Sequence, residues 1–494
     1  MSASGVDDPR QARVQAAWLF GGSLALRLLV VAFAARRFPP ADDGTFYHAV
    51  AARIADGAGY TWAWPDGAVT YAAHYPVGYP ALLGAVYALL GATPLSAMLL
   101  NALLGALLVV AVHAAALRVT SLPRARLAGL AIALDPTLIL YTAAVMTEAA
   151  AAAILLLLAS YALRLHARGS SFGARLPLGI GGALLLLVRP QLLPLLPVLG
   201  AVALAVPPEI GARRERWLRL RSALEVLLVA LACCAPWTLR NCSKMDGCVF
   251  VSANGGWNLL IGTLPEGRGS FAPIAGPTVP TECRDVFGEA GKDRCFGRAG
   301  LRRIEAAPLA WLALAPQKLG QLFNHSAIAS SYLQTSNPRL IDERARTAIA
   351  TVETLYGRLL LLAACAGVLR AASGTLGRAV ALGAGLVTLS PWGFVAELGL
   401  LISVVIERPG PGRRPLELLA VSVLGLCVVT HIVFFGAARY ALVWLPWLAL
   451  LLVLPRRGVA NRPFGARGRA SLLTAAHAAD DNFRSSRSPS DAAD

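Results

Sequence analysis

Long apolar runs alternate with short polar gaps along most of this 494-residue chain. Several runs reach the ~20 residues that an α-helix needs to cross the hydrocarbon core of a bilayer. We therefore expect an all-α polytopic membrane protein with about twelve transmembrane helices. Their approximate bounds are 16–35, 96–119, 128–140, 148–165, 176–188, 191–206, 222–236, 352–369, 376–391, 392–406, 416–435 and 440–454.

Composition supports a membrane environment. Hydrophobic residues make up 56% of the chain and charged residues only 15%, against roughly 25% charged residues in ordinary soluble domains. A soluble chain of this length would need a polar shell to cover its core, so lipid must serve as the solvent here.

The net charge of +17 comes from basic residues that cluster in short gaps between apolar runs. This distribution is typical of the positive-inside rule and excludes a nucleic-acid-binding face as its main meaning. It predicts a cytoplasmic N-terminus (1–15), a transmembrane domain (16–455) and a basic, disordered cytoplasmic tail (456–494). The first apolar run is long and lacks a cleavage site, so we expect an anchor rather than a signal peptide. The expected location is the plasma membrane, the inner membrane of a bacterium.

Two long gaps, about 37–95 and 237–351, fall on the opposite, external or periplasmic face. They are rich in Tyr, Trp and Gly and are expected to carry short interfacial helices, where aromatic rings prefer to lie. The second gap contains Cys242, Cys248, Cys283 and Cys295. An oxidising compartment favours disulfides over four free thiols, and all three connectivities stay open.

Charged residues gather at the external ends of the predicted helices. Charges at membrane depth are costly and often functional. Arginine forks suit phosphate oxygens, and a carboxylate beside them can take a proton from an attacking hydroxyl. The alternative is a purely structural role, in which the arginines snorkel to lipid head groups or form ion pairs that hold helices together. The acids are Asp42, Asp43 and Glu148, and the arginines are Arg189, Arg240 and Arg439.

Motifs along the chain resemble, in order, those of the membrane-embedded glycosyltransferase C superfamily. The resemblance is to the bacterial branch similar to protein O-mannosyltransferases and lipid A aminoarabinose transferases. Each motif alone is weak, but the ordered set is specific. The motifs are Asp43-Gly-Thr-Phe-Tyr47 with a following Gly-Ala-Gly-Tyr60, His74-Tyr-Pro-Val-Gly-Tyr-Pro80, Thr147-Glu148, Arg189-Pro190, Pro236-Trp-Thr-Leu-Arg240-Asn241, Asn254-Gly-Gly-Trp-Asn-Leu-Leu-Ile-Gly262 and Arg439-Tyr440.

The resemblance implies an inverting transfer of a sugar from a polyprenyl-phosphate donor to an acceptor hydroxyl. Asp43 matches the family's first-loop acid and would be the general base or an acceptor-positioning acid, with adjacent Asp42 as the competing candidate. Glu148 would support the reacting centre. The arginines would clamp the leaving phosphate, and Tyr47 and His74 would join the binding site. No cofactor is required, although two adjacent acids could hold a divalent cation.

A transporter or lipid flippase is the competing class. Such proteins often carry internal repeats and charges at the bilayer midplane. The two halves of this chain show no repeat, and its charges lie at the external helix ends, which favours the enzyme. The sugar stays open, and so does the acceptor, whether protein, lipid or polysaccharide.

The predicted topology places the four cysteines of the second long gap outside the cell membrane. After reduction, a thiol probe that cannot cross membranes should label Cys242 or Cys295 in intact cells. Mass spectrometry of labelled peptides measures this. Labelling that appears only after lysis would overturn the topology.

Overall fold

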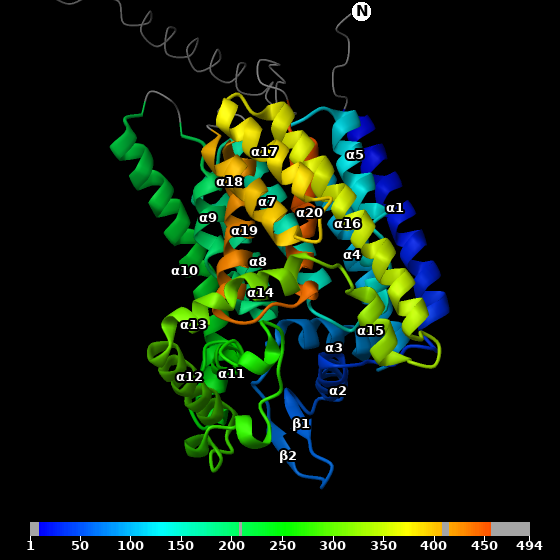
Figure 1. The fold of residues 1–494 in the computed structure, drawn as a ribbon, viewed down its shortest axis with the longest axis vertical. Helices are drawn as coiled ribbons and strands as arrows, with labels where there is room; N and C mark the ends of the chain where they lie inside the picture. The colour runs from blue at the N-terminus through cyan, green and yellow to red at the C-terminus, as the bar shows by residue number, and fades with distance from the viewer. Residues whose placement is uncertain (1–8, 207–209, 408–413, 456–494) are drawn as a thin grey trace, which may run out of the picture.

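The computed structural model describes residues 9–206, 210–407 and 414–455. Residues 1–8, the predicted basic loop with Arg408 and Arg413, and the predicted tail 456–494 lie outside the described residues. Figure 1 shows a bundle of long helices above a smaller layer of short helices and one β-hairpin.

Six helices of the described chain are long and apolar enough to cross a membrane. A seventh span results if the bent pair Leu122–Ala133 and Pro136–Ala143 is counted as one. These helices make the chain a multi-pass membrane protein. The six are α1 (Pro9–Ala34), α4 (Pro94–Ala116), α7 (Glu148–Arg168), α10 (Ala212–Lys244), α16 (Glu343–Ala371) and α19 (Arg414–Val433).

The predicted number of twelve spans stays a prediction, because the remaining apolar segments form short helices. The third predicted span is broken between α5 (Leu122–Ala133) and α6 (Pro136–Leu140), with a bend of 53°. Pro136 lacks a backbone N–H, and Asp135 accepts a hydrogen bond from the Leu138 N–H at 3.0 Å to cap the new helix. The other short segments are α8 (Phe172–Val188), α9 (Leu195–Ala203), α17 (Thr375–Val387), α18 (Gly393–Ile406), and α20 (Leu445–Leu452) after the 3₁₀-helix η6 (Ala438–Val443).

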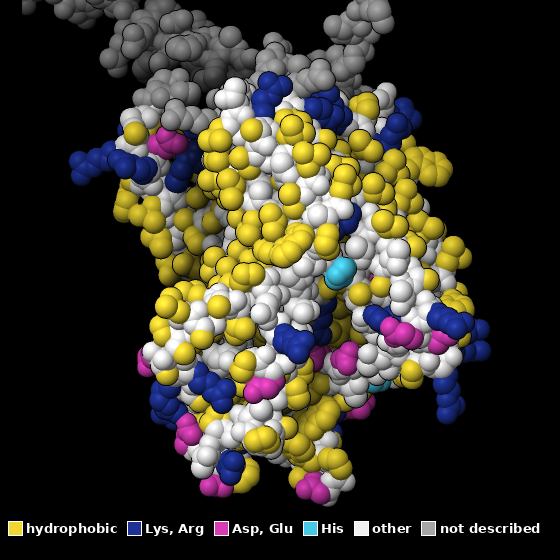
Figure 2. All heavy atoms as spheres, viewed as in Figure 1, with side chains coloured by type: hydrophobic (Ala, Val, Ile, Leu, Met, Phe, Trp, Pro, Cys, Tyr) yellow, Lys and Arg dark blue, Asp and Glu magenta, His cyan; other side chains and the backbone are white. Residues whose placement is uncertain are grey.

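The connections α4–α5 and α16–α17 and the start of α10, which carry predicted basic residues, lie at the upper end of the bundle (Figure 1). Figure 2 shows blue side chains at this end, a mainly hydrophobic band below it and mixed charge at the lower end. The helices therefore run between a basic end and an end of mixed charge.

The lower layer consists mainly of the two long gaps of the sequence. One departure from the all-α expectation is a hairpin of β1 (Thr61–Ala63) and β2 (Val69–Tyr71), in which Thr61 pairs with Tyr71. Gly67 has φ +87° in the connecting turn, a conformation that glycine adopts without strain. The helices of this layer are α2 (Asp43–Ala55), α3 (Gly78–Leu90), α11 (Gly255–Ile261), α12 (Glu289–Ala306), α13 (Pro308–Ala313), α14 (Ala315–Phe323) and α15 (Ala329–Ser336).

Helix α10 is longer than predicted. It does not end at Pro236 but continues to Lys244. The extension is held by side chains of its last turns, because the Thr238 hydroxyl donates to the Phe250 carbonyl at 2.8 Å and the Trp237 indole to the Val251 carbonyl at 3.0 Å. Arg240 therefore lies on a helix rather than in a loop.

The four cysteines of the second long gap form two local disulfides, Cys242–Cys248 and Cys283–Cys295. Cys283 and Cys295 are buried with Leu260 and Phe296, whereas Cys248 is exposed. An aqueous thiol probe is therefore expected to react first with the Cys242–Cys248 pair after reduction.

Helix α11 is fixed by close approach to α12. A Cβ atom on Gly256 would lie 1.8 Å from the Asp293 carbonyl oxygen. The Asp293 carboxylate accepts hydrogen bonds from the Gly256 and Trp257 N–H groups at 2.7 and 3.1 Å. The adjacent Gly255 has no atom within 4 Å of its Cβ position. The second glycine of the Asn-Gly-Gly-Trp motif thus has a packing role that the first lacks.

These neighbouring glycines make a matched pair of variants. Gly256→Ala should lower the free energy of unfolding by about 1–3 kcal/mol or more, because the added methyl group forces α11 off α12. Gly255→Ala should change it by less than about 0.5 kcal/mol. Thermal unfolding of both variants in detergent measures this, and equal midpoints for the two variants would contradict the packing.

Candidate active site

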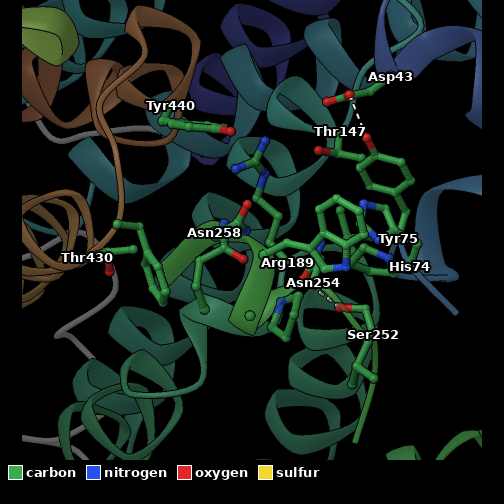
Figure 3. A pocket seen from close by; sticks show the side chains of 18 of the residues that line it. Asp43, His74, Tyr75, Thr147, Arg189, Ser252, Asn254, Asn258, Thr430 and Tyr440 are labelled. Atoms are coloured by element: carbon green, nitrogen blue, oxygen red, sulfur yellow. Dashed lines mark hydrogen bonds between the residues drawn. The ribbon is translucent and has the colours of Figure 1, made fainter. Parts of the chain in front are cut away.

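A cavity of about 530 Å³ lies where the helix bundle meets the lower layer. Its walls come from the starts of α2 and α7, the end of α8, residues 250–261, the end of α19 and η6. Figure 3 shows Asp43 and Thr147 on one side of this cavity and Ser252 and Asn254 on another. Six of the predicted site residues line it: Asp43, Tyr47, His74, Glu148, Arg189 and Arg439.

Both acids of the cavity are the first residues of helices. Asp43 begins α2 and Glu148 begins α7. The positive end of a helix dipole stabilises negative charge there. Asp43 accepts hydrogen bonds from the Tyr75 hydroxyl at 2.7 Å and from Arg439 at 2.8 Å. Its carboxylate is therefore held by two donors at the edge of the cavity.

Glu148 is 1% exposed and pairs with Arg189. It also accepts a hydrogen bond from the Tyr141 hydroxyl at 3.2 Å. Arg189 follows the last turn of α8 and precedes Pro190, which disfavours the helical conformation at Arg189 and ends the helix there. The Arg189 Nε is buried without a hydrogen-bond partner in the structure. This guanidinium group therefore retains an unused donor.

Arg439 connects the two acids. Besides its bond to Asp43, its Nε lies 3.7 Å from the Glu148 carboxylate. The ring of Tyr440 lies near both guanidinium groups, with centroids 5.1 Å from Arg439 and 5.2 Å from Arg189. Two acids and two arginines from four distant segments thus form one linked cluster with a formal net charge of zero.

Tyr332 on α15 fixes the two acid-bearing segments relative to each other. Its hydroxyl accepts hydrogen bonds from the Ala41 N–H at 3.1 Å and from the Val145 N–H at 3.2 Å. These residues lie just before Asp43 and Glu148. The bridging contact keeps the starts of α2 and α7 side by side.

Asp42 does not line the cavity. Its side chain is exposed, and its φ of 51° is unusual for a residue other than glycine. This backbone turn begins α2 at Asp43 and directs the neighbouring carboxylates differently. Of the two candidate acids, only Asp43 pairs with Arg439 and so joins the cluster of Asp43, Glu148, Arg189 and Arg439.

Arg240 also lies outside the cavity. It donates to the Ala72 carbonyl at 2.8 Å and to the Tyr60 carbonyl at 2.7 Å, and it packs over the Trp237 ring at 4.7 Å. Both carbonyls flank the β-hairpin. Arg240 therefore joins the first long gap of the sequence to α10, and the structure does not bring it to Arg189 and Arg439.

His74 and Tyr47 line the side of the cavity near Asp43. Burial lowers the pKa of His74 to about 4, so its ring is neutral near pH 7. The ring contacts Tyr75 at 4.7 Å and Trp257 at 5.3 Å between centroids. Tyr47 packs edge to face against Tyr75 at 5.2 Å. Both residues shape the wall that holds Asp43.

Several cavity residues had not been singled out as site residues in the sequence. Tyr75 and Tyr440 follow predicted residues directly, so adjacency was a usable signal. The amides had a weaker signal, the four-residue spacing of Asn254, which immediately precedes α11, and Asn258 within it. Additional lining residues are Gln191, Ser252, Asn254, Trp257, Asn258 and His431.

Metal binding was expected, if at all, at Asp42 and Asp43. Residues 9–206, 210–407 and 414–455 contain no group of three or more His, Cys, Asp or Glu side chains placed to hold a metal ion. A cation at the adjacent acids stays a prediction.

Comparison with known proteins finds similarity at the level of structure. No protein-family model matches the chain, and no curated protein matches it significantly. The apo oligosaccharyltransferase of Archaeoglobus fulgidus matches with 13% identity and a TM-score of 0.46, over 98% of this chain and 53% of that one. The same archaeal enzyme, AglB, with an inhibitory peptide and a dolichol-phosphate matches with 12% identity and a TM-score of 0.43, again over 98% of this chain and 53% of that one.

ArnT from Cupriavidus metallidurans bound to undecaprenyl phosphate matches with 15% identity and a TM-score of 0.36, over 87% of this chain and 76% of that one. These neighbours are glycosyltransferases of the C-type membrane fold, the superfamily that the sequence motifs resemble. The chain spans about half the length of the archaeal chains it matches.

The contacts of Arg240 predict a role in holding the hairpin. Arg240→Lys should lower the free energy of unfolding by about 1–3 kcal/mol, because lysine cannot reproduce the planar fork that serves both carbonyls. Limited proteolysis should cut residues 59–73 faster in the variant. Unchanged cleavage and an unchanged unfolding midpoint would contradict this role.

Proposed function

We propose that this protein transfers a sugar from a polyprenyl-phosphate donor to an acceptor hydroxyl, with inversion, on the external or periplasmic face of the membrane. The observation that carries the proposal is the cluster of Asp43, Glu148, Arg189 and Arg439 in one cavity at the helix ends. An acid beside two guanidinium groups combines a proton acceptor with a binding site for phosphate oxygens.

In the proposed reaction, the acceptor oxygen attacks the anomeric carbon of the sugar. The new bond between oxygen and carbon forms as the bond from that carbon to the phosphate oxygen breaks. The electron pair of the broken bond leaves with polyprenyl phosphate. Asp43 takes the proton of the acceptor hydroxyl, and the Tyr75 and Arg439 donors hold its carboxylate in position.

The arginines stabilise the charge that develops on the leaving phosphate. Arg189 and Arg439 both line the cavity, where their guanidinium groups can bind phosphate oxygens. Glu148 positions both arginines, because it contacts Arg189 directly and Arg439 at 3.7 Å. Their position at the helix ends suits a donor whose phosphate lies at the membrane surface while its tail stays in lipid.

A transporter is supported less well by the same contacts. A transport site is commonly built at the midplane from broken helices. Here the paired charges lie at the starts of α2 and α7 and at the end of α8, beside a layer of extramembrane segments. The mixed-charge end of the bundle favours chemistry at a surface.

Transfer in membranes supplied with a labelled lipid-linked sugar tests the role of Asp43. Asp43→Asn should lower the rate of sugar transfer by about 10²–10⁴-fold, because the amide cannot accept the proton. Asp42→Asn should cost much less, since this side chain lies outside the cavity.

Asp66→Asn is the matched control, because Asp66 is an exposed acid in the hairpin turn. It should leave transfer unchanged. Full transfer by Asp43→Asn would rule out Asp43 as the base, and a complete loss with Asp42→Asn alone would move the role to its neighbour.

A further inference from the structure

One wall of the cavity is made of uncharged polar and aromatic side chains. We call it the neutral wall and define it as His74, Ser252, Asn254, Trp257 and Asn258, all of which line the cavity. Figure 3 places Ser252 and Asn254 apart from Asp43 and Thr147, whereas His74 lies beside Tyr75 and joins the neutral wall to the side of the cavity that holds Asp43. The neutral wall is therefore a second surface of the same cavity, distinct from the arginine cluster.

The neutral wall is rigid because α11 is rigid. Trp257 and Asn258 lie in the first turn of α11, and Asn254 is the residue that immediately precedes this helix. Asp293 ties the start of α11 through the Gly256 and Trp257 N–H groups. A Cβ atom on Gly262, at the other end, would lie 2.4 Å from the Phe434 carbonyl oxygen. Both ends of α11 are thus fixed against other segments.

Polar atoms of the neutral wall are suited to hydroxyl groups. Asn254 accepts a hydrogen bond from Ser252 at 3.2 Å, and each amide side chain carries two donors and an acceptor. The Trp257 Nε1 is buried, so Trp257 offers the cavity its ring rather than its N–H group. Aromatic faces and amides together bind molecules that have both apolar and hydroxyl-bearing surfaces.

No free carboxylate faces this wall from the described residues that line the cavity. The lining carboxylates are Asp43 and Glu148, and both are paired with arginines. Two further acids stand behind the wall and serve its backbone: Glu289 accepts from the Ala73 N–H at 2.5 Å, and Asp293 holds α11. An ammonium group placed here would be desolvated without a counter-charge, which is costly.

We propose, on the basis of the proposed function above, that the neutral wall binds the sugar ring of the donor and selects an uncharged sugar over one that carries an amino group. The amide groups bond the ring hydroxyls, and the Trp257 ring packs against the apolar face of the sugar. An amino sugar binds more weakly, because every carboxylate that lines the cavity is already paired with an arginine and none is available to its ammonium group. The donor class is therefore a polyprenyl-phosphate-linked neutral hexose or pentose.

Equilibrium binding to the purified full-length chain in detergent micelles tests this, because binding requires no acceptor. Three ligands are compared at pH 7 by calorimetry. They are polyprenyl phosphate, the same lipid phosphate linked to a neutral hexose, and the same lipid phosphate linked to a protonated amino hexose. The wild type should bind the neutral-hexose ligand about tenfold more tightly than the amino-hexose ligand.

Asn258→Ala and Asn254→Ala should remove most of the gain in affinity that the neutral hexose adds, while leaving the affinity for polyprenyl phosphate within about twofold of wild type. Unchanged binding of polyprenyl phosphate also shows that each variant is folded. Gln317→Ala is the matched control, since Gln317 is an exposed amide on α14 outside the cavity. It should leave all three affinities unchanged.

Equal affinity for the neutral and amino ligands overturns the inference. The inference is also overturned if the neutral-hexose ligand binds no more tightly than polyprenyl phosphate. The same holds if both asparagine variants lose affinity equally for all three ligands. These results leave the proposed function intact. Failure of the wild type to bind any of the three ligands overturns the proposed function itself, and the inference with it.

Discussion

The candidate site depends on the requirement that buried charges be paired. Glu148 is 1% exposed and Arg189 is 7% exposed, so an unpaired charge at either position would be costly. Their contact, together with the bonds of Arg439 to both acids, joins the starts of α2 and α7 to the end of α8 and to η6. Removing one partner of such a pair commonly costs about 3–5 kcal/mol. The same cluster that positions these helices supplies the acid and the cations of the proposed reaction.

Around this cluster, extramembrane segments are fixed by contacts between backbone groups and single side chains. Arg240 serves two carbonyls beside the hairpin, Tyr332 bridges the segments before the two acids, and Gly256 lets α11 approach α12. Each contact joins segments far apart in the sequence. These contacts support the cavity wall, which suits the proposed role of the site in orienting a lipid-linked donor.

Much of the site could be predicted from the sequence, because the cost of charge at membrane depth makes each charged residue informative. Asp43, Glu148, Arg189 and Arg439 were found in this way. Arg240 had the same signal, but its guanidinium bonds backbone carbonyls instead of lining the cavity. Position along the membrane normal alone does not distinguish an arginine that lines the cavity from one that bonds backbone carbonyls beside it. The hairpin had a usable signal, an Asp-Gly turn between aromatic and β-branched residues, yet so short a strand pair depends on α10 for its support.

The sequence by itself determined the class of the protein, a multi-pass membrane chain with acids and arginines at helix ends, because apolar length and charge position follow directly from the cost of polar groups in lipid. Only the tertiary structure decided which acid faces the cavity, which arginines meet it and that α11 and His74 join in the neutral wall. These outcomes depend on contacts between residues up to 396 positions apart, such as that of Arg439 with Asp43, and no local pattern specifies such distant partners.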